Sequence, residues 1–186
     1  APPLLPCTAA AVLEIIRSRR PQLRGAEVVM VGHSDVVGKP VALQLLNALA
    51  TVTVCHLGTR DLALHTRRAE ILVVAAGKAG LIRGEMIRPG ALVVDVGINR
   101  VERDGKPALG GDVAWDEALA VAGEITPVPG GVGPLTLACL MRNLAALAGG
   151  RPCLRAVTTP ACRLSFRIAP KYQIIKGSTS SSGTAH

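Results

Sequence analysis

The sequence has few aromatic residues, no long apolar run and no closely paired cysteines. One Trp, one Tyr and one Phe among 186 residues leave the hydrophobic core to Ala, Val, Leu and Ile, which suits a sheet packed against helices of small side chains. No apolar run reaches the length that crosses a bilayer, so we expect no membrane helix. The first residues, Ala-Pro-Pro-Leu-Leu-Pro, lack the charged and apolar regions of a secretion signal.

The five cysteines form no C-x-x-C pair and no ligand-like spacing with the four histidines. We therefore expect no metal site. Cys55 lies in a strand pattern and Cys139 in a helix pattern, where cysteine usually acts as a small buried hydrophobe. Reduced thiols of this kind are typical of a cytoplasmic protein.

Acidic residues are missing from residues 151–186, which hold six of the 21 basic residues and none of the 13 acidic ones. Most of the net charge of +8 therefore comes from this segment. The first 150 residues contain 15 basic and 13 acidic residues, an ordinary balance for an enzyme. This distribution argues against a nucleic-acid-binding surface.

The most informative stretch is residues 27–50. An apolar run of strand length ends at Gly32, a turn of small residues follows, and an apolar helix pattern occupies residues 41–50. Such a unit opens many nucleotide-binding sheets, with phosphate at the turn. Gly32 permits unusual backbone angles, Gly38 keeps side chains away from the helix start, and we expect the first helix N–H groups to be unpaired there. The alternative is a strand-turn-helix unit without a ligand.

Further short β-branched runs occupy residues 50–56, 70–77 and 91–97. Their hydrophobicity is continuous rather than alternating, which indicates strands covered on both faces. The fold class predicted is α/β, a Rossmann-like doubly wound and mostly parallel sheet with helices on both faces. The helices expected are residues 9–20 with Thr8 as N-cap, 41–50, a helix that starts within 59–62 and runs through 67, 114–122 and 137–148.

Several predicted strand ends meet at one edge of this sheet. No acid follows the second strand, where NAD-binding folds usually place a carboxylate on the ribose. Asp95 lies within an apolar strand, and we expect a partnered structural carboxylate there rather than a catalytic one. Asp104-Gly105 is typical of a hairpin tip. Residues 125–136 hold several prolines and glycines before a helix, which favours a binding loop over a rigid linker.

At this point the sequence resembles the bifunctional methylenetetrahydrofolate dehydrogenase/cyclohydrolase family, in its C-terminal cofactor-binding domain. The resemblance begins at Pro6-Cys7-Thr8 and ends at Met141-Arg142-Asn143. It includes V-G-H-S-D-V-V-G-K-P, T-V-T-V-C-H, D-V-G-I-N-R, G-G-D-V and I-T-P-V-P-G-G-V-G-P-L-T. The resemblance implies oxidation of 5,10-methylenetetrahydrofolate by hydride transfer to a nicotinamide, then hydrolysis to 10-formyltetrahydrofolate, in one-carbon metabolism.

The resemblance and the strand ends together give a set of expected site residues. Cofactor contacts are expected from Gly32, His33, Ser34, Gly38, His56, Leu57, Thr59, Arg60, Ala76, Gly77, Gly97, Ile98 and Thr136. The loop on the substrate side is expected to include Pro129, Gly130 and Gly131. The expected cofactor is NADP, with NAD as the alternative. Family members that prefer NADP resemble G-R-S at the turn and C-H-S after the second strand, whereas this chain has His33 and Leu57.

The resemblance assigns no catalytic residue, because the family's catalytic Tyr and Lys belong to an N-terminal domain that precedes Pro6-Cys7-Thr8. We therefore expect residues 1–148 to form the dinucleotide-binding domain, with tetrahydrofolate derivatives as substrates of the enzyme. The alternative is a binding module without turnover. A homodimer is expected, paired through the open sheet edge. Residues 149–186 are expected to stay apart from the core, although β-formers in 164–168 and 171–176 permit added strands.

Overall fold

The computed structural model describes residues 4–103, 105–148 and 174–177. Its helices are α1 (Cys7–Arg19), α2 (Gly38–Asn47), α3 (Leu62–Thr66), the 3-10 helix η1 (Gly84–Met86), α4 (Trp115–Val121) and α5 (Val132–Leu147). Its strands are β1 (Glu27–Val31), β2 (Thr51–Cys55), β3 (Ile71–Val74), β4 (Leu92–Asp95), β5 (Asn99–Arg103), β6 (Lys106–Gly110), β7 (Glu124–Ile125) and β8 (Ile175–Lys176).

Six strands form one sheet in the order β2-β1-β3-β4-β7-β8. β1 pairs in parallel with β2 on one side and with β3 on the other. β4 and β7 continue the parallel sheet beyond β3. The chain therefore adds strands in opposite directions on either side of β1, so a crevice opens between the carboxyl ends of β1 and β3. Ligands of doubly wound sheets bind at this kind of switch point.

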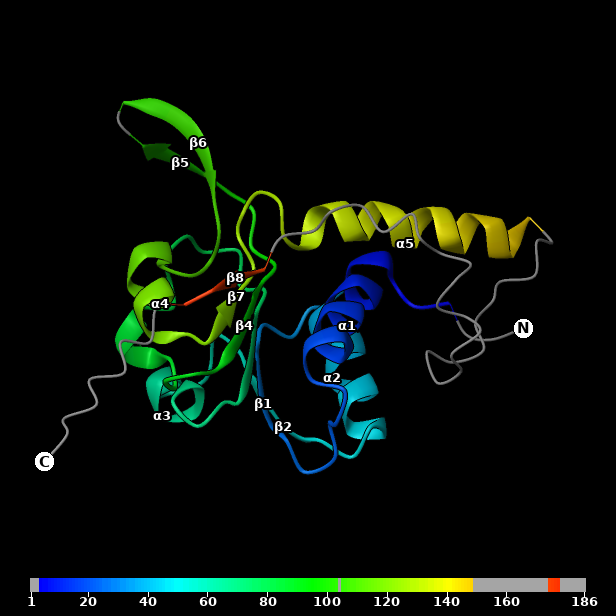
Figure 1. The fold of residues 1–186 in the computed structure, drawn as a ribbon, viewed down its shortest axis with the longest axis horizontal. Coiled ribbons are helices and arrows are strands. Elements are labelled where there is room, and N and C mark those ends of the chain that lie inside the picture. Colours follow the sequence, from blue (N-terminus) through cyan, green and yellow to red (C-terminus); the bar gives the residue numbers. More distant parts are fainter. Residues whose placement is uncertain (1–3, 104, 149–173, 178–186) are drawn as a thin grey trace, which may run out of the picture.

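Helices cover both faces of the sheet, as the sequence predicts (Figure 1). On one face, α1, α2 and α5 pack on alternate residues of the central strands, including Val28, Met30 and Ile71. On the other face, Val29 and Leu72 lie in a second core with residues of η1, α4 and the loops beside them. Adjacent residues of one strand thus enter different cores, which explains the continuous hydrophobicity of these strands.

Two helices begin earlier than their apolar patterns indicate. α2 begins at Gly38 rather than at residue 41, and α5 begins at Val132 rather than at residue 137. Pro40 and Pro134 each occupy the third helical position, where a backbone N–H has no partner within the helix. α1 is preceded by Pro6, so the expectation of Thr8 as its N-cap is wrong.

α5 packs along α1 (Figure 1). The Arg142 guanidinium donates to a Glu14 carboxylate oxygen at 2.8 Å. The Asn143 side-chain amide donates to the carbonyl oxygen of Leu5 at 3.0 Å. These contacts fix the orientation of α5, and therefore of the loop that leads into it.

Strands β5 and β6 form an antiparallel hairpin that projects from the sheet edge (Figure 1). Their register runs from Asn99↔Gly110 to Arg103↔Lys106. The hairpin predicted at this place in the sequence is confirmed. Because the hairpin leaves the carboxyl end of β4 and returns at Gly110, it stands beside the predicted site.

The prediction that residues 151–186 stay apart from the domain is wrong for residues 174–177. β8 pairs antiparallel with β7, with Ile175 opposite Ile125. Gly177 N donates to the carbonyl oxygen of Gly123 at 3.0 Å, and Ile174 packs on the core. This matches the alternative in which β-formers of 171–176 add a strand. The other residues of 149–186 lie outside the described residues.

No described helix is long and apolar enough to cross a membrane. Three cysteines in the described part of the chain, Cys7, Cys55 and Cys139, are free thiols. Burial is the main cause that raises the thiol pKa of Cys55 and Cys139. Both residues therefore act as the small core side chains that their positions predict.

Candidate functional site

The turn after β1 lies against the end of β3. Gly32 has a φ of 114°, and a Cβ added there would overlap the carbonyl oxygen of Ala75. A Cβ on Gly38 would overlap the carbonyl oxygen of Gly32. Glycine is therefore required at both positions, and the backbone of the turn lies directly at the switch point.

Ser34 organises this turn from within. Its Oγ accepts from Val37 N at 3.2 Å and from Gly38 N at 3.4 Å, and its carbonyl oxygen accepts from Lys39 N at 3.0 Å. The expectation that the first helix N–H groups are unpaired is therefore wrong. The backbone N–H groups of residues 33–35 have no acceptor within the described residues, and these remain available for an anion.

The turn after β2 lies beside the first one, because Val31 and Cys55 are register partners. His56 N donates to Thr59 Oγ1 at 2.9 Å, which fixes the turn. The ring of His56 lies 5.2 Å from that of His33, centroid to centroid. Leu57 and Arg60, the other residues expected to contact the cofactor here, are exposed.

The end of β3 is held by a buried carboxylate. Asp112 Oδ2 accepts from Ala76 N at 2.6 Å and from Gly77 N at 2.8 Å. Its Oδ1 accepts from the Asn99 side-chain amide at 2.7 Å. Asp112 has no exposed surface, so these three donors satisfy it without water. It fixes the small-residue loop that forms one wall of the crevice.

Asp95 at the end of β4 is likewise a partnered carboxylate. Its Oδ1 accepts from Gly97 N at 2.9 Å and Asp112 N at 3.0 Å, and its Oδ2 accepts from Val113 N at 3.0 Å. Burial raises the pKa of Asp95 to about 6, although these three N–H groups act in the opposite direction. The prediction of a partnered carboxylate at this position is confirmed.

The loop between β7 and α5 adds a further wall. Thr126 is fully buried, and its Oγ1 accepts from Asp95 N at 2.9 Å. The Val128–Pro129 peptide bond is cis, and Gly131 precedes the first turn of α5. Thr136 lies inside α5, where its hydroxyl donates to the carbonyl oxygen of Val132 at 3.1 Å. Pro129 is exposed and Gly130 is partly exposed beside the crevice.

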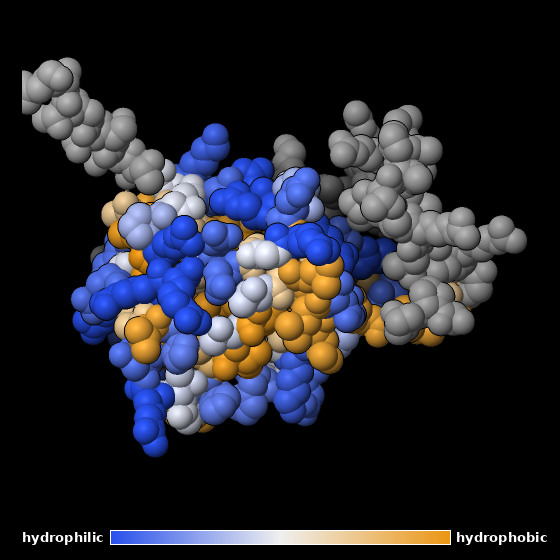
Figure 2. Space-filling view, turned by 90° about the horizontal axis from the view of Figure 1, so that it is seen from below, coloured by the Kyte–Doolittle hydropathy of each residue, from blue (hydrophilic) through white to orange (hydrophobic). Residues whose placement is uncertain are grey.

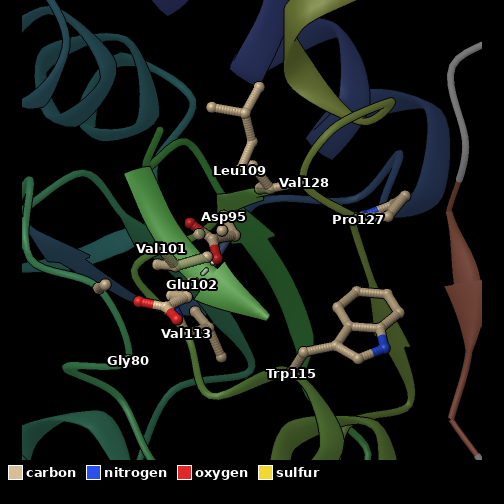
Figure 3. A pocket seen from close by; sticks show the side chains of 12 residues that line it. Gly80, Asp95, Val101, Glu102, Leu109, Val113, Trp115, Pro127 and Val128 are labelled. Atoms are coloured by element: carbon tan, nitrogen blue, oxygen red, sulfur yellow. Dashed lines mark hydrogen bonds between the residues drawn. The ribbon is translucent and has the colours of Figure 1, made fainter. Parts of the chain in front are cut away.

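A cavity of about 400 Å³ opens next to these residues, between the hairpin and the loop that precedes α5. Figure 3 shows Asp95 between Val101 of the hairpin and Val128 of the loop, with Trp115 across the opening. Most of the residues that line it are apolar or glycine. Asp95 and Glu102 contribute the carboxylates.

The structure brings most of the expected site residues to one edge. Residues 32–34, 56–60 and 76–77 follow β1, β2 and β3, while Ile98 follows β4 and is exposed. Gly97 is buried, and a Cβ there would overlap the Asp112 carboxylate. The sequence interpretation missed the support given by Asp112 and Asn99. In the sequence, the feature that could have revealed this support is a polar residue flanked by small residues at the end of a strand.

The sheet is doubly wound and mostly parallel, with a glycine turn at its switch point and available backbone donors beside it. These features define a Rossmann-like nucleotide-binding domain. Comparison with known proteins identifies the family. Residues 6–151 match the tetrahydrofolate dehydrogenase/cyclohydrolase NAD(P)-binding domain, and the chain belongs to this family.

Two curated relatives show the extent of this similarity. Bifunctional protein FolD 3 of Roseobacter denitrificans is 57% identical over 141 residues, which cover 75% of this chain and 49% of the relative. Bifunctional protein FolD of Syntrophobacter fumaroxidans is 55% identical over 174 residues, or 90% of this chain and 54% of the relative. The chain thus spans about half the length of these relatives.

Solved structures agree with this assignment. The bifunctional FolD enzyme of Campylobacter jejuni superposes with a TM-score of 0.73 at 48% identity, covering 79% of this chain and 51% of that one. FolD of Trypanosoma brucei, solved with NADP and an inhibitor, gives a TM-score of 0.72 at 45% identity, covering 82% and 52%.

Proposed function

We propose that this chain is the cofactor-binding part of a methylenetetrahydrofolate dehydrogenase with methenyltetrahydrofolate cyclohydrolase activity, and that its cofactor is NADP. The observation on which this rests is the glycine turn pressed against the end of β3. Beside it, the backbone N–H groups of residues 33–35 have no acceptor in the part of the chain that the structure describes. Family membership narrows the ligand to a nicotinamide dinucleotide.

The residues fit such a ligand. Backbone N–H groups of residues 33–35 are suited to a pyrophosphate, since they present a concentrated set of donors without a bulky side chain. Ala76 and Gly77 leave room for a ribose beside the crevice, and their loop is fixed by Asp112. When bound, the nicotinamide would accept the hydride, and the protein's part is position and electrostatics.

The absence of a carboxylate between His56 and Arg60 favours NADP over NAD. A carboxylate at the end of β2 would accept from the ribose hydroxyls and repel a 2′-phosphate. In this chain the turn offers His56, Thr59 and Arg60 instead. Arg60 is exposed and its guanidinium is a suitable phosphate donor.

Calorimetric titration of the 186-residue polypeptide with NADP tests the proposal directly. Ala76→Leu is the informative variant, because this exposed side chain would extend into the crevice; we expect at least a tenfold loss of affinity, roughly 1.4 kcal/mol. Ala120→Leu, an exposed position on α4, is the control and should bind normally. A wild-type polypeptide that binds neither NADP nor NAD would refute the function.

The substrates and the reaction are proposed for the enzyme to which this domain belongs. Tetrahydrofolate one-carbon derivatives are expected to bind on the side of Pro129, Gly130 and Gly131. An absorbance assay with methylenetetrahydrofolate and NADP distinguishes turnover by the 186-residue polypeptide from binding alone. We expect the reaction to occur in the cytoplasm, where the free thiols stay reduced.

Homodimerisation through the β2 edge is the second part of the proposal. The β7 edge is covered by β8, whereas β2 has no strand beyond it within the described residues. Val54 on β2 and Leu43 and Leu46 on α2 are exposed beside this edge. Figure 2, which views the molecule from below Figure 1, shows apolar surface on the side where α2 and β2 lie. Two antiparallel β2 strands about a twofold axis would bury it.

Sedimentation velocity at micromolar concentration tests this interface. Val54→Lys should convert a dimer to a monomer, because it places a charge in the proposed interface. Leu109→Lys on the hairpin should leave the dimer intact. A wild-type monomer, or a dimer broken only by the hairpin variant, would contradict pairing through β2.

A further inference from the structure

The cavity between the β5–β6 hairpin and the loop before α5 contains groups that the proposed function does not use. Its volume is about 400 Å³, and no Lys, Arg or His of the described residues lines it. The charged groups of its lining are the carboxylates of Asp95 and Glu102. Because the whole chain carries a net charge of +8, this cavity is an acidic place in a basic protein.

Asp95 carries its charge without a cationic partner. Its Oδ1 accepts from two backbone N–H groups, whereas its Oδ2 accepts only from Val113 N, so Oδ2 keeps acceptor capacity. In the part of the chain that the structure describes, no Lys, Arg or His forms an ion pair with it. Burial raises the pKa of Asp95 to about 6, so the carboxylate is mostly ionised at pH 7. A cation placed beside it would stabilise this charge.

Glycine at position 111 keeps the second oxygen of Asp95 uncovered. Gly111 lines the same cavity, and a Cβ added there would overlap Asp95 Oδ2. Gly80 and Gly110 also contribute backbone rather than side chains to the lining. The lining therefore leaves room beside the carboxylate instead of filling it.

The remaining lining suits a flat apolar group. Trp115, the first residue of α4, is partly buried, and Figure 3 shows it and Glu102 on opposite sides of the opening. Val101 of the hairpin and Pro127 and Val128 of the loop add apolar surface. A ring can therefore stack on the indole while a cationic end reaches the carboxylates.

We propose that this cavity binds a small organic cation with a flat apolar body, such as an aromatic amidine or guanidine. The cationic end donates to Asp95 Oδ2 and to the Glu102 carboxylate, and the body packs on Trp115. The site is separate from the proposed cofactor crevice, because none of residues 32–34, 56–60 and 76–77 lines the cavity. The inference therefore does not depend on the proposed function.

Benzamidine is the probe for this site, because it joins a flat ring to an amidinium. Trp115 is the only tryptophan in the sequence, so a saturable change in tryptophan fluorescence reports occupation of the cavity. Benzamide has nearly the same shape without the charge, and we expect it to bind at least about tenfold more weakly. Saturating NADP should leave the affinity for benzamidine unchanged.

Calorimetric titration of variants of the 186-residue polypeptide with benzamidine locates the site. Glu102→Gln, at an exposed position, should weaken binding about threefold, and Trp115→Leu about fivefold. Trp115→Phe keeps a ring and should retain most of the affinity. Asp116→Asn, exposed on α4 and outside the lining, is the control for loss of a carboxylate and should bind as the wild type does.

Several results would overturn the inference. Equal affinities for benzamidine and benzamide would show that the cavity has no preference for a cation, and a wild type that binds neither would show that it is no site. Wild-type affinity in both Glu102→Gln and Trp115→Leu would show that the probe binds elsewhere. Loss of benzamidine binding in the presence of NADP would make the cavity part of the cofactor crevice. If Trp115→Leu does not fold, the exposed Glu102→Gln variant still decides the location.

Discussion

Asp95→Asn should change the pH dependence of the free energy of unfolding. The change should be opposite in sign to the one expected from removing a typical carboxylate. Burial is the main cause that raises the pKa of Asp95 from 3.8 to about 6. Between these values the folded state binds a proton more strongly than the unfolded state does. Stability conferred by this group therefore falls as pH rises from about 4 to 6 and is lowest above pH 6.

The magnitude can be worked from the shift. About two pH units at 1.36 kcal/mol each give a cost of about 3 kcal/mol for the ionised side chain at pH 7. Asparagine resembles the protonated acid, so the variant avoids this cost. Its amide NH₂ would meet Val113 N–H, or the N–H groups of Gly97 and Asp112, without an acceptor; this adds a pH-independent penalty of about 1–3 kcal/mol.

Urea denaturation of both proteins between pH 4 and pH 7 separates the two effects. The variant should gain about 2 kcal/mol relative to the wild type across this range. The difference in unfolding free energy between the variant and the wild type at pH 4 measures the penalty from the misplaced amide. Asp116→Asn, an exposed position on α4, is the control for removal of a carboxylate. A difference that stays constant with pH, or that moves against the variant as pH rises, would refute the argument.

Three further changes have defined outcomes. Gly32→Ala should destabilise the fold by about 2 kcal/mol or more in chemical denaturation and prevent NADP binding, because Gly32 has a φ of 114° and contacts the end of β3. Gly133→Ala is the control, since Gly133 has open space around it. Arg19→Ala should cost about 1 kcal/mol at pH 7 and progressively less as pH falls, since the Arg19 hydrogen bond is the main cause that lowers the pKa of Glu124. Gly177→Ala should release β8, because a Cβ there overlaps the backbone at the end of α4, and amide exchange at this residue should accelerate while β1 stays protected.

The strands could be predicted from the sequence because each is a continuous run of β-branched residues. The predicted runs at 50–56, 70–77 and 91–97 contain β2, β3 and β4. Their burial on both faces follows from the same composition. Strand order was not predictable in this way, since it depends on which helices cover which face.

The starts of α2 and α5 were predicted too late for one physical reason. Each has proline as its third residue, and an apolar period that is counted from after the proline misses the first turn. β8 was predicted only as an alternative, because it pairs over two residues with β7, which is itself two residues long. So short a strand depends on an edge that only the folded sheet provides.

The buried carboxylates of Asp95 and Asp112 explain why glycine occupies positions whose role the sequence alone does not reveal. Cβ atoms on Gly32 and Gly38 would overlap the backbone carbonyl oxygens of Ala75 and Gly32, whereas Cβ atoms on Gly97 and Gly111 would overlap the Asp112 and Asp95 carboxylates. The two pairs have the same residue type and lie at the same edge. What separates them is the group that each makes room for: a backbone carbonyl oxygen at Gly32 and Gly38, and a buried carboxylate at Gly97 and Gly111. These carboxylates are held together, since Asp112 N donates to Asp95 and Asp112 accepts from the loop after β3. Gly97 is expected to contact the cofactor, and its lack of a Cβ also makes room for the Asp112 carboxylate that holds the crevice wall.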